Sequence, residues 1–388
     1  MKILKVLDVM FFAGIFLGLG YLIKYMFSEI FKSHRKEVSP RAGLGKHPLY
    51  SVNVEAFGTF RKMVSSVRDE LSTRFEQLRP DNATKLFLAK CKSQEEVEVR
   101  KSVASVVRAK HGTYRLDYIE SIGAAPTFVA SRKQWEALLN SIGFRQLPAD
   151  ATMLDIGAGN GELTATLAAS LGIAAESVTA VEVSNVFRLR LKERGFKVVD
   201  RIDAPLTSTC EIDGDNLSSC IASNVGSHSS HSSSSDMGRS SHSSSGASLD
   251  ANDVVVLESA YDVVVLANVL DRCDDPAELL QISRDRLRKT SEPPRLIIVT
   301  IALPFRSAVV SEKGSLGRPK RPLPIVSVGE HTNVTAFEYH VAGFANAAFH
   351  PLGLEIVAWA RVPYLCCSFL GPDHHTYHEA IFFLRPRV

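Results

Sequence analysis

The chain has 388 residues, which is enough for one large domain with additions or for two ordinary domains. Hydrophobic residues make up 45% and charged residues 22%, proportions that are typical of a folded globular protein rather than a disordered one. The formal net charge is only +3, from 45 Lys and Arg against 42 Asp and Glu. Nucleic-acid binding usually needs a concentrated basic face, so it is not expected here.

Residues 1–30 are predicted to form a hydrophobic membrane anchor. The run Val9–Ile23 contains no charged residue, and apolar neighbours extend it toward the ~20 residues that span a bilayer. A cleaved signal peptide is the alternative, but the residues after the run are large, unlike a small-residue cleavage site. Positive charges between Lys24 and Lys46 outnumber those before the run, so the positive-inside rule places the body in the cytosol. We expect a single-pass anchor in an endomembrane, of the endoplasmic reticulum or the mitochondrion.

Two regions follow before the main domain. Residues 31–82 are polar and mixed, with proline as punctuation, and they predict a linker with some helix. Residues 83–147 have apolar positions at helical spacing, which predicts an N-terminal helical region with a buried stripe. The stripe consists of Phe87, Leu88, Cys91, Val97, Val103, Val106 and Val107, and later of Trp135, Leu138, Leu139 and Ile142.

Residues 148–388 alternate short β-rich runs with helices, which predicts an α/β, Rossmann-like domain with a mostly parallel sheet. The last two predicted strands, Leu354–Arg361 and Ala380–Arg385, are separated by about 18 residues and read as a terminal antiparallel pair. That arrangement is typical of the class I methyltransferase fold rather than of most nicotinamide dehydrogenases. The earlier predicted strands are Thr152–Ile156, Ser177–Val183, Lys197–Val199, Tyr261–Ala267 and Arg295–Leu303.

An insertion at about residues 207–252 interrupts this pattern. It is rich in Ser and has almost no apolar periodicity, so it is predicted to be disordered. His228 and His231 lie three residues apart, but Ser/His tracts of this kind are usually only solvated, and no metal site is expected. The six cysteines lack zinc-site spacing, and we predict free thiols in a chain able to build its own core. They are Cys91, Cys210, Cys220, Cys273, Cys366 and Cys367.

A glycine-rich loop follows the first strand of this domain. It reads Asp155-x-Gly157-x-Gly159-x-Gly161 and precedes a good helix start. Glycines allow tight turning and close approach of the backbone to a ligand, and exposed N–H groups at a helix start can hold an anionic group. The spacing differs from the G-x-G-x-x-G of dinucleotide enzymes. It suits a cofactor whose ammonium and carboxylate lie at this turn, with Asp155 accepting from the ammonium or ordering water.

A second acid points to a nucleoside. Glu182 ends the next predicted strand and lies 21 residues after Gly161, near the ~20 expected for an acid that accepts from ribose hydroxyls. Both an adenosine-bearing cofactor and a nicotinamide dinucleotide contain such a ribose. Glu182 therefore predicts a nucleoside without choosing between them.

A third group follows the strand that ends at Ala267. In open α/β sheets, ligands bind at the carboxyl ends of the strands, and Asn268 is delivered there with an amide that can donate and accept. Asp271 lies three residues after Asn268 in the chain and is a candidate to orient or deprotonate a nucleophilic nitrogen. Helix capping is the alternative role for Asp271, and periodicity does not separate the two.

Four segments of the sequence resemble the DREV family of methyltransferases, the protein-histidine N-pros-methyltransferases. They are Leu154–Thr164, Tyr261–Pro276 (YDVVVLANVLDRCDDP), Ile301–Phe305 (IALPF) and Arg361–Cys366 (RVPYLC). The resemblance runs from about Phe87 to Val388, broken by the insertion.

The resemblance implies methyl transfer from S-adenosylmethionine to the histidine ring nitrogen nearest the backbone, in protein substrates with closely spaced histidines of the His-x-His kind. Glu182, Asn268 and Tyr364 match the family's cofactor contacts. Asp155 and Gly157 match its glycine loop, with Gly159 and Gly161 completing the turn. Asp271 matches the acid of the LDRCD segment and would hold the target imidazole, so Asp271 and Asn268 are the candidate catalytic residues.

The sequence departs from the family at two places. The family's acidic stretch after Cys366 is replaced by Cys367-Ser368-Phe369-Leu370-Gly371, and the Ser/His-rich insertion is added. The first departure bears on how histidine-rich substrates are chosen. Two alternatives stay open, namely a methyltransferase for a small molecule or another side chain, and a membrane-tethered binding protein with an inactive methyltransferase fold. A nicotinamide oxidoreductase is disfavoured by the glycine spacing and by the terminal strand pair.

Overall fold

The computed structural model describes residues 49–59, 63–111, 116–123, 125–144, 147–202, 260–289, 295–310, 316–325, 335–368 and 374–387. The predicted membrane anchor, the first part of the predicted linker and the Ser/His-rich insertion, with His228 and His231, lie outside these residues. Among the residues described, no helix is long and apolar enough to cross a membrane. The same residues contain no group of His, Cys, Asp and Glu side chains that could hold a metal ion.

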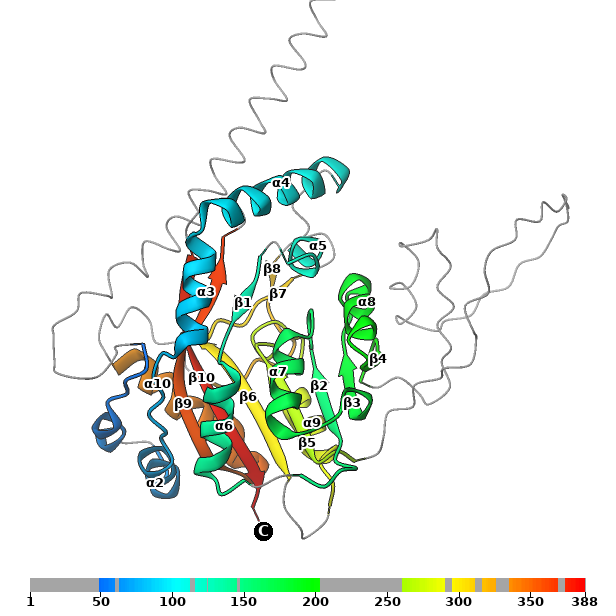
Figure 1. The fold of residues 1–388 in the computed structure, drawn as a ribbon. Coiled ribbons are helices and arrows are strands. Elements are labelled where there is room, and N and C mark those ends of the chain that lie inside the picture. The colour runs from blue at the N-terminus through cyan, green and yellow to red at the C-terminus, as the bar shows by residue number, and fades with distance from the viewer. Residues whose placement is uncertain are drawn as a thin grey trace, which may run out of the picture.

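A mixed sheet of eight strands forms the centre of the described structure, in the order β1-β9-β10-β6-β5-β2-β3-β4 (Figure 1). Neighbours from β6 to β4 are parallel, whereas β10 is antiparallel to both β6 and β9. The predicted mostly parallel sheet with a terminal antiparallel pair is thus confirmed. The strands are β1 (Thr127–Phe128), β2 (Met153–Ile156), β3 (Val178–Val181), β4 (Lys197–Val199), β5 (Val263–Ala267), β6 (Leu296–Leu303), β9 (Leu354–Cys367) and β10 (His374–Pro386). A small separate pair joins β7 (Val309–Val310) to β8 (Leu316–Gly317).

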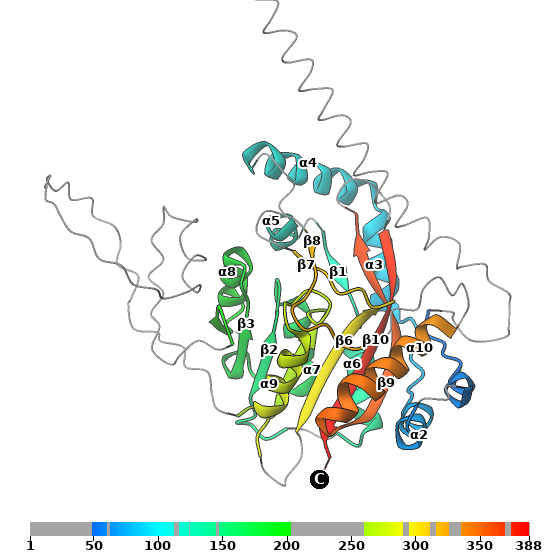
Figure 2. The same cartoon turned by 180° about the vertical axis from the view of Figure 1, so that it is seen from behind.

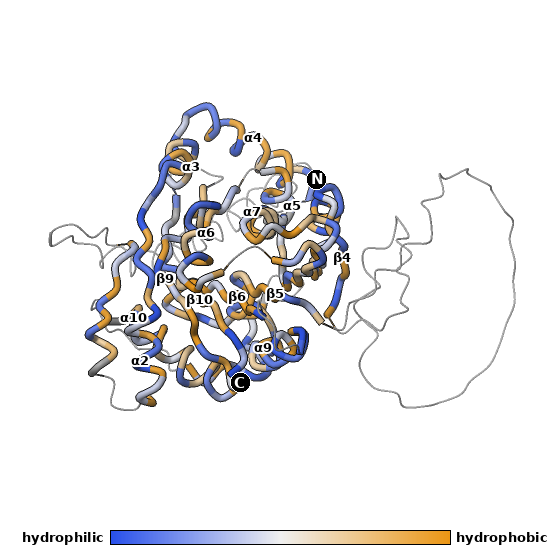
Figure 3. The backbone as a smooth tube through the Cα atoms, turned by 60° about the horizontal axis from the view of Figure 1, so that its bottom comes forward, coloured by the Kyte–Doolittle hydropathy of each residue, from blue (hydrophilic) through white to orange (hydrophobic). Residues whose placement is uncertain are grey.

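Helices cover both faces of the sheet, which explains why β2 and β3 are buried at every position. One face packs against α6 (Arg132–Ser141), α7 (Glu162–Leu171) and α8 (Asn185–Glu193). The other packs against α2 (Ser65–Thr73), α9 (Pro276–Asp285) and α10 (Thr335–Phe344), as Figure 2 shows from behind. Hydropathy alternates along helices such as α2 and α10 (Figure 3), as expected for helices with one buried side. The short turns are η1 (Val54–Thr59), η2 (Ala175–Ser177), η3 (Ala345–Phe349) and η4 (His350–Leu352).

Local sequence signals explain where two of these helices begin. Ser131 caps α6 in a reciprocal capping box with Gln134. Asp275 caps α9 by accepting from the backbone N–H of Glu278, and Pro276 occupies the first turn, where its missing N–H costs nothing.

The described residues 49–59 and 63–80, which belong to the predicted linker, are packed into the domain. Phe57 and Leu71 are fully buried. The Trp359 indole of β9 donates to the Leu71 carbonyl at 2.9 Å, and its ring meets Phe57 edge-on at 5.8 Å. The few apolar residues of this segment are anchored by a partner far away in the chain, which local composition does not reveal.

The terminal strands are longer than predicted. Strand β9 continues from Arg361 to Cys367, and β10 begins at His374 rather than at Ala380. The polar residues between His374 and His378 have weak strand signals of their own. They extend the sheet because each pairs with β9, as His375 does with Cys366 and Tyr377 with Tyr364.

The N-terminal helical region contains α3 (Asn82–Lys92), α4 (Gln94–His111) and α5 (Leu116–Ser121), and then the short strand β1 that pairs with β9. Cys91 at the end of α3 forms a disulfide with Cys367 at the end of β9, with Cα atoms 5.4 Å apart. The prediction of free thiols is therefore wrong for these two residues. Their 276-residue separation hides the pairing from any spacing rule. Cys273 and Cys366 are free.

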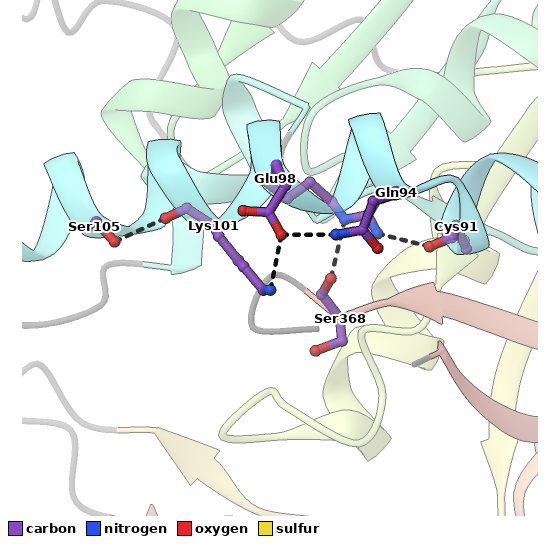
Figure 4. A network of polar contacts seen from close by, with 7 residues as sticks. Cys91, Gln94, Glu98, Lys101, Ser105 and Ser368 are labelled. Atoms are coloured by element: carbon purple, nitrogen blue, oxygen red, sulfur yellow. Dashed lines mark hydrogen bonds and ion pairs between the residues drawn. The ribbon is translucent and has the colours of Figure 1, made fainter. Parts of the chain in front are cut away.

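A buried arginine strengthens the same junction. Arg100 of α4 is 2% exposed. Its guanidinium donates to the Ser368 carbonyl at 3.0 Å and to the Cys91 carbonyl at 2.7 Å. Figure 4 labels these two acceptor residues, Cys91 and Ser368, beside α4. The disulfide and these two bonds together fasten the end of β9 to the α3–α4 corner.

Candidate active site

The glycine loop lies between β2 and α7, at the carboxyl end of the parallel strands. Gly157, Gly159 and Gly161 all have positive φ, at 77°, 56° and 78°, so the backbone needs residues without a Cβ. The Gly157 N–H donates to the Val181 carbonyl of β3 at 2.8 Å. The predicted tight turn is thus present and tied to the neighbouring strand.

The three glycines differ in what surrounds them. A Cβ on Gly161 would lie 2.7 Å from Cδ2 of Leu191, and one on Gly157 would lie 2.9 Å from Cγ2 of Val269. Nothing lies within 4 Å of a Cβ built on Gly159. Gly157 and Gly161 therefore serve close packing, whereas Gly159 leaves open space where a ligand can approach the backbone.

Asp155 lies fully buried at the end of β2. Its Oδ2 accepts from the Thr164 hydroxyl of α7 at 2.6 Å, and its Oδ1 has no hydrogen-bond partner among the described residues. Burial raises the pKa of this carboxyl to about 7 despite the Thr164 bond that lowers it. A buried carboxylate oxygen without a donor is costly, so this atom calls for a ligand ammonium or an ordered water.

Glu182 follows β3 and lies beside the loop, as its spacing predicted. Its Oε2 accepts from the Gly159 N–H at 2.9 Å, and its Oε1 accepts from the Ser184 N–H at 2.8 Å. Burial raises its pKa, and these backbone bonds oppose that change. A carboxylate has about four lone-pair positions, so a fixed Glu182 retains capacity for ribose hydroxyls.

Asn268 follows β5 and adopts φ of 51°, rare for a residue with a side chain. Its backbone N–H donates to the Thr300 carbonyl at 3.0 Å, and its Oδ1 accepts from the Ala302 N–H at 3.1 Å. Its Nδ2 donates to Oε1 of Glu379 at 2.8 Å. The Asn268 side chain therefore joins the end of β5 to β6 and β10.

Asp271 lies in the turn after Asn268 and is 18% exposed at its side chain. Its Oδ1 is buried and lacks a partner among the described residues, while Oδ2 lies 3.8 Å from Nε of Arg272. Burial raises the pKa of Asp271, and Arg272 opposes the rise. The backbone carbonyl of Asp271 accepts from the Ala308 N–H at 2.8 Å. The cap of the following helix, α9, is Asp275 and not Asp271.

Tyr364, predicted as a cofactor contact, is a residue of β9. It lies on β9 opposite Tyr377, with ring centroids 6.1 Å apart. Burial raises the pKa of Tyr364 well above its ordinary value, and the nearby Arg272 charge lowers it. Arg272 also interacts with Asp271 and Glu120, so segments from α5, the β5 turn and β9 meet around it.

The two halves of the predicted site touch directly. Val269, between Asn268 and Asp271 in the chain, packs against Gly157 of the loop. Asp155, Gly159 and Glu182 form one half, and Asn268 and Asp271 lie in the turn whose Val269 packs against it. Three features fit the predicted adenosine-bearing cofactor. Glu182 can accept hydrogen bonds from ribose hydroxyls, the turn at Gly159 is open to a ligand, and the buried Asp155 has an oxygen without a partner among the described residues.

Glu379 is a site residue that was not predicted from the sequence. It is fully buried on β10 and bonded to Asn268. Burial raises its pKa to about 7, and the side chains of Thr300 and Asn268 oppose the rise by hydrogen bonding. One signal was present in the sequence, because an isolated acid directly precedes the apolar run Ala380–Leu384 of a predicted strand.

Comparison with known proteins identifies the family. The model described as DREV methyltransferase matches residues 62–222 and 230–386. Similar solved structures include the CcbJ methyltransferase from Streptomyces caelestis, at 16% identity and TM-score 0.29, covering 66% of this chain and 90% of that one. A SAM-dependent methyltransferase from Aquifex aeolicus has 12% identity and TM-score 0.29, covering 64% and 88%. A DhpI–SAH complex has 12% identity and TM-score 0.29, covering 77% and 97%.

The family match spans most of the chain and includes the glycine loop, the Asn268 turn and both terminal strands. The chain therefore belongs to the DREV methyltransferase family, and S-adenosylmethionine is its methyl donor.

Proposed function

We propose that this enzyme methylates the pros nitrogen of histidine in proteins with closely spaced histidines. The proposal rests on the environment of Asp271. This residue lies in the turn that packs against the glycine loop through Val269, and its buried Oδ1 has no partner among the described residues. A carboxylate at that place suits an acceptor that has both a nucleophilic atom and an N–H, as imidazole does.

Asp271 would set the tautomer of the acceptor ring. S-adenosylmethionine, when bound, supplies an electrophilic methyl group. Asp271 accepts from the far ring N–H, so the lone pair of the near nitrogen is free to form the new N–CH₃ bond as the S–CH₃ bond breaks. The ring becomes positively charged in this step and then loses its far N–H proton to Asp271, which leaves neutral methylhistidine and S-adenosylhomocysteine.

The charge of Asp271 gives the reaction a pH dependence. Because burial raises the pKa of Asp271, this group becomes protonated at a higher pH than an exposed aspartate, and the rate should fall as pH decreases through that value. The imidazole acceptor must also be neutral, and its pKa is about 6.5. In Asp271→Asn the overall rate should be low, and the pH dependence caused by Asp271 should disappear. The pH dependence caused by ionisation of the substrate imidazole should remain.

A peptide assay tests the proposal. The enzyme is incubated with labelled S-adenosylmethionine and a His-x-His peptide, beside the same peptide with each His changed to Ala. Label that disappears with the His→Ala changes supports histidine as the target. Label that survives both changes indicates another side chain. Binding of S-adenosylhomocysteine with no transfer to any acceptor in a protein extract supports the inactive, tethered alternative.

We further propose that residues 1–30 hold the enzyme at an endomembrane, with the folded body on its oxidising side. The uncharged run Val9–Ile23 supports the anchor. The Cys91–Cys367 disulfide supports a location of the folded body on the oxidising side of the membrane, because disulfides form and persist in oxidising compartments. This side is opposite to the cytosolic one that the positive-inside rule predicts from a small excess of charge.

A further inference from the structure

Glu379 has no assigned task in methyl transfer, although it is 0% exposed and lies directly behind the candidate catalytic turn. It stands on β10, 111 residues from Asn268, and its Oε1 accepts from Nδ2 of Asn268 at 2.8 Å. A buried acid is costly to keep, so its complete burial beside Asn268 points to a task at the site.

The conformation of the Asn268 turn must be stabilised by contacts with other elements. Its φ of 51° is strained for a residue with a side chain, and such a conformation persists only when the surroundings determine it. Three bonds do so here. The Asn268 N–H and Oδ1 are bonded to Thr300 and Ala302 of β6, and Nδ2 is bonded to Glu379.

The orientation of that amide fixes the rest of the turn. The Ala302 N–H can only donate and an ionised Glu379 can only accept, so together they direct Oδ1 toward Ala302 and Nδ2 toward Glu379. Rotation of the amide by a half-turn would place Oδ1 against the Glu379 carboxylate and Nδ2 against an N–H, so both contacts would become repulsive. Val269, which packs on Gly157, and Asp271 both come after Asn268 in the same turn.

We propose that Glu379 is a positioning residue that locks the Asn268 amide and so fixes Val269 against the glycine loop and Asp271 at the acceptor. For its kinetic readout this inference rests on the proposed function. In this proposal Glu379 acts on the turn through its hydrogen bond with Asn268 and does not itself touch the acceptor.

Three variants test the proposal. Glu379→Leu removes the carboxylate that accepts the hydrogen bond from Asn268 and replaces it with an apolar side chain. It should lower kcat about tenfold, the scale of a lost hydrogen bond to a charged group. Glu379→Gln keeps an oxygen for Nδ2 and should stay within about threefold of the wild type. Glu338→Leu is the matched control, because Glu338 on α10 is also 0% exposed and its Oε2 has no partner among the residues described. Its Oε1 accepts from the Asn53 N–H and not from the Asn268 turn.

A double mutant separates positioning from general destabilisation. If Glu379 acts through Asn268, then Glu379→Leu added to Asn268→Ala should lower kcat by no more than about twofold. A further tenfold loss in the double mutant would overturn the proposal, as would a Glu379→Leu enzyme with wild-type kcat. A kcat loss in Glu338→Leu equal to that in Glu379→Leu would also overturn it.

Amide hydrogen exchange tests the same proposal without any methyl-accepting substrate. The Ala302 and Asn268 amides, both bonded within this turn, should exchange about tenfold faster in Glu379→Leu and at the wild-type rate in Glu379→Gln and Glu338→Leu. Unchanged exchange in Glu379→Leu would contradict the lock. A wild-type enzyme that fails to methylate the His-x-His peptide would overturn the proposed function alone, because the exchange result stands independently of it.

Discussion

Asp155 and Glu379 are fully buried carboxyl groups, and burial raises the pKa of each to about 7. In an unfolded chain such groups ionise near pH 4. Between about pH 4 and pH 7 the native state therefore binds more protons than the unfolded state, and these groups make the free energy of unfolding fall as pH rises. His340 acts in the opposite sense, because burial lowers its pKa to about 4 and its contribution is lost as pH falls below about 6.5.

The Asp155→Asn variant isolates one of these contributions. Asn keeps an oxygen for the Thr164 hydroxyl but cannot ionise, so the variant should gain stability relative to the wild type as pH rises, by at most about 1.4 kcal/mol per pH unit between pH 4 and 7. Urea unfolding of both proteins at pH 5 and pH 7.5 measures this difference. A difference that does not change with pH would contradict the raised pKa of Asp155.

Glu182 should control affinity for the cofactor. In Glu182→Gln an amide N–H₂ replaces one acceptor that now receives the Gly159 or Ser184 N–H, so both the loop and the ribose contact are disturbed. We expect S-adenosylhomocysteine to bind at least about tenfold more weakly, since a hydrogen bond to a charged group contributes about 1.5–3 kcal/mol. Titration calorimetry measures the affinity. The exposed Glu176 in turn η2 provides the control, and equal affinity of Glu182→Gln and Glu176→Gln would refute the assignment.

At the scale of elements, local patterns predicted the features that depend on neighbours in the chain. The turn at Gly157–Gly161 and the strands before Glu182 and Asn268 result from glycine spacing and continuous apolar runs. The pairs formed across long separations were hidden. Glu379 meets Asn268 across 111 residues, Cys91 meets Cys367 across 276, and Trp359 bonds to Leu71 across 288. Each partner alone reads as an ordinary residue of a strand or helix.

The disulfide should stabilise the junction between α3 and β9. Cys91→Ser with Cys367→Ser should lower the free energy of unfolding by about 2–4 kcal/mol, because the cross-link restricts the unfolded chain. The matched control is Cys273→Ser, which removes a free thiol. Thermal unfolding with and without reductant measures the effect. The double variant should lose its sensitivity to reductant, and a wild type whose unfolding temperature ignores reductant would contradict a stabilising disulfide.

At the scale of the whole molecule, the membrane segment and the disulfide together predict where the body lies. In intact vesicles prepared from endomembranes, we expect residues 49–387 to be protected from added protease and to become digestible after detergent. Alkylation before reduction should leave Cys91 and Cys367 unlabelled. Digestion in intact vesicles, together with labelled Cys91 and Cys367, would place the body on the cytosolic side that the flanking charges predict.

Asp271 is proposed to direct methyl transfer to one nitrogen of histidine, and the isomer of the product reports this directly. A His-x-His protein methylated by the wild-type enzyme can be hydrolysed, and its two methylhistidine isomers can be separated and quantified. We expect the pros isomer from the wild type. From Asp271→Ala we expect a normal affinity for S-adenosylhomocysteine with a rate at least about a hundredfold lower, the scale of general base catalysis. Formation of the tele isomer, or equal rates for the wild type and Asp271→Ala, would show that Asp271 does not have this role.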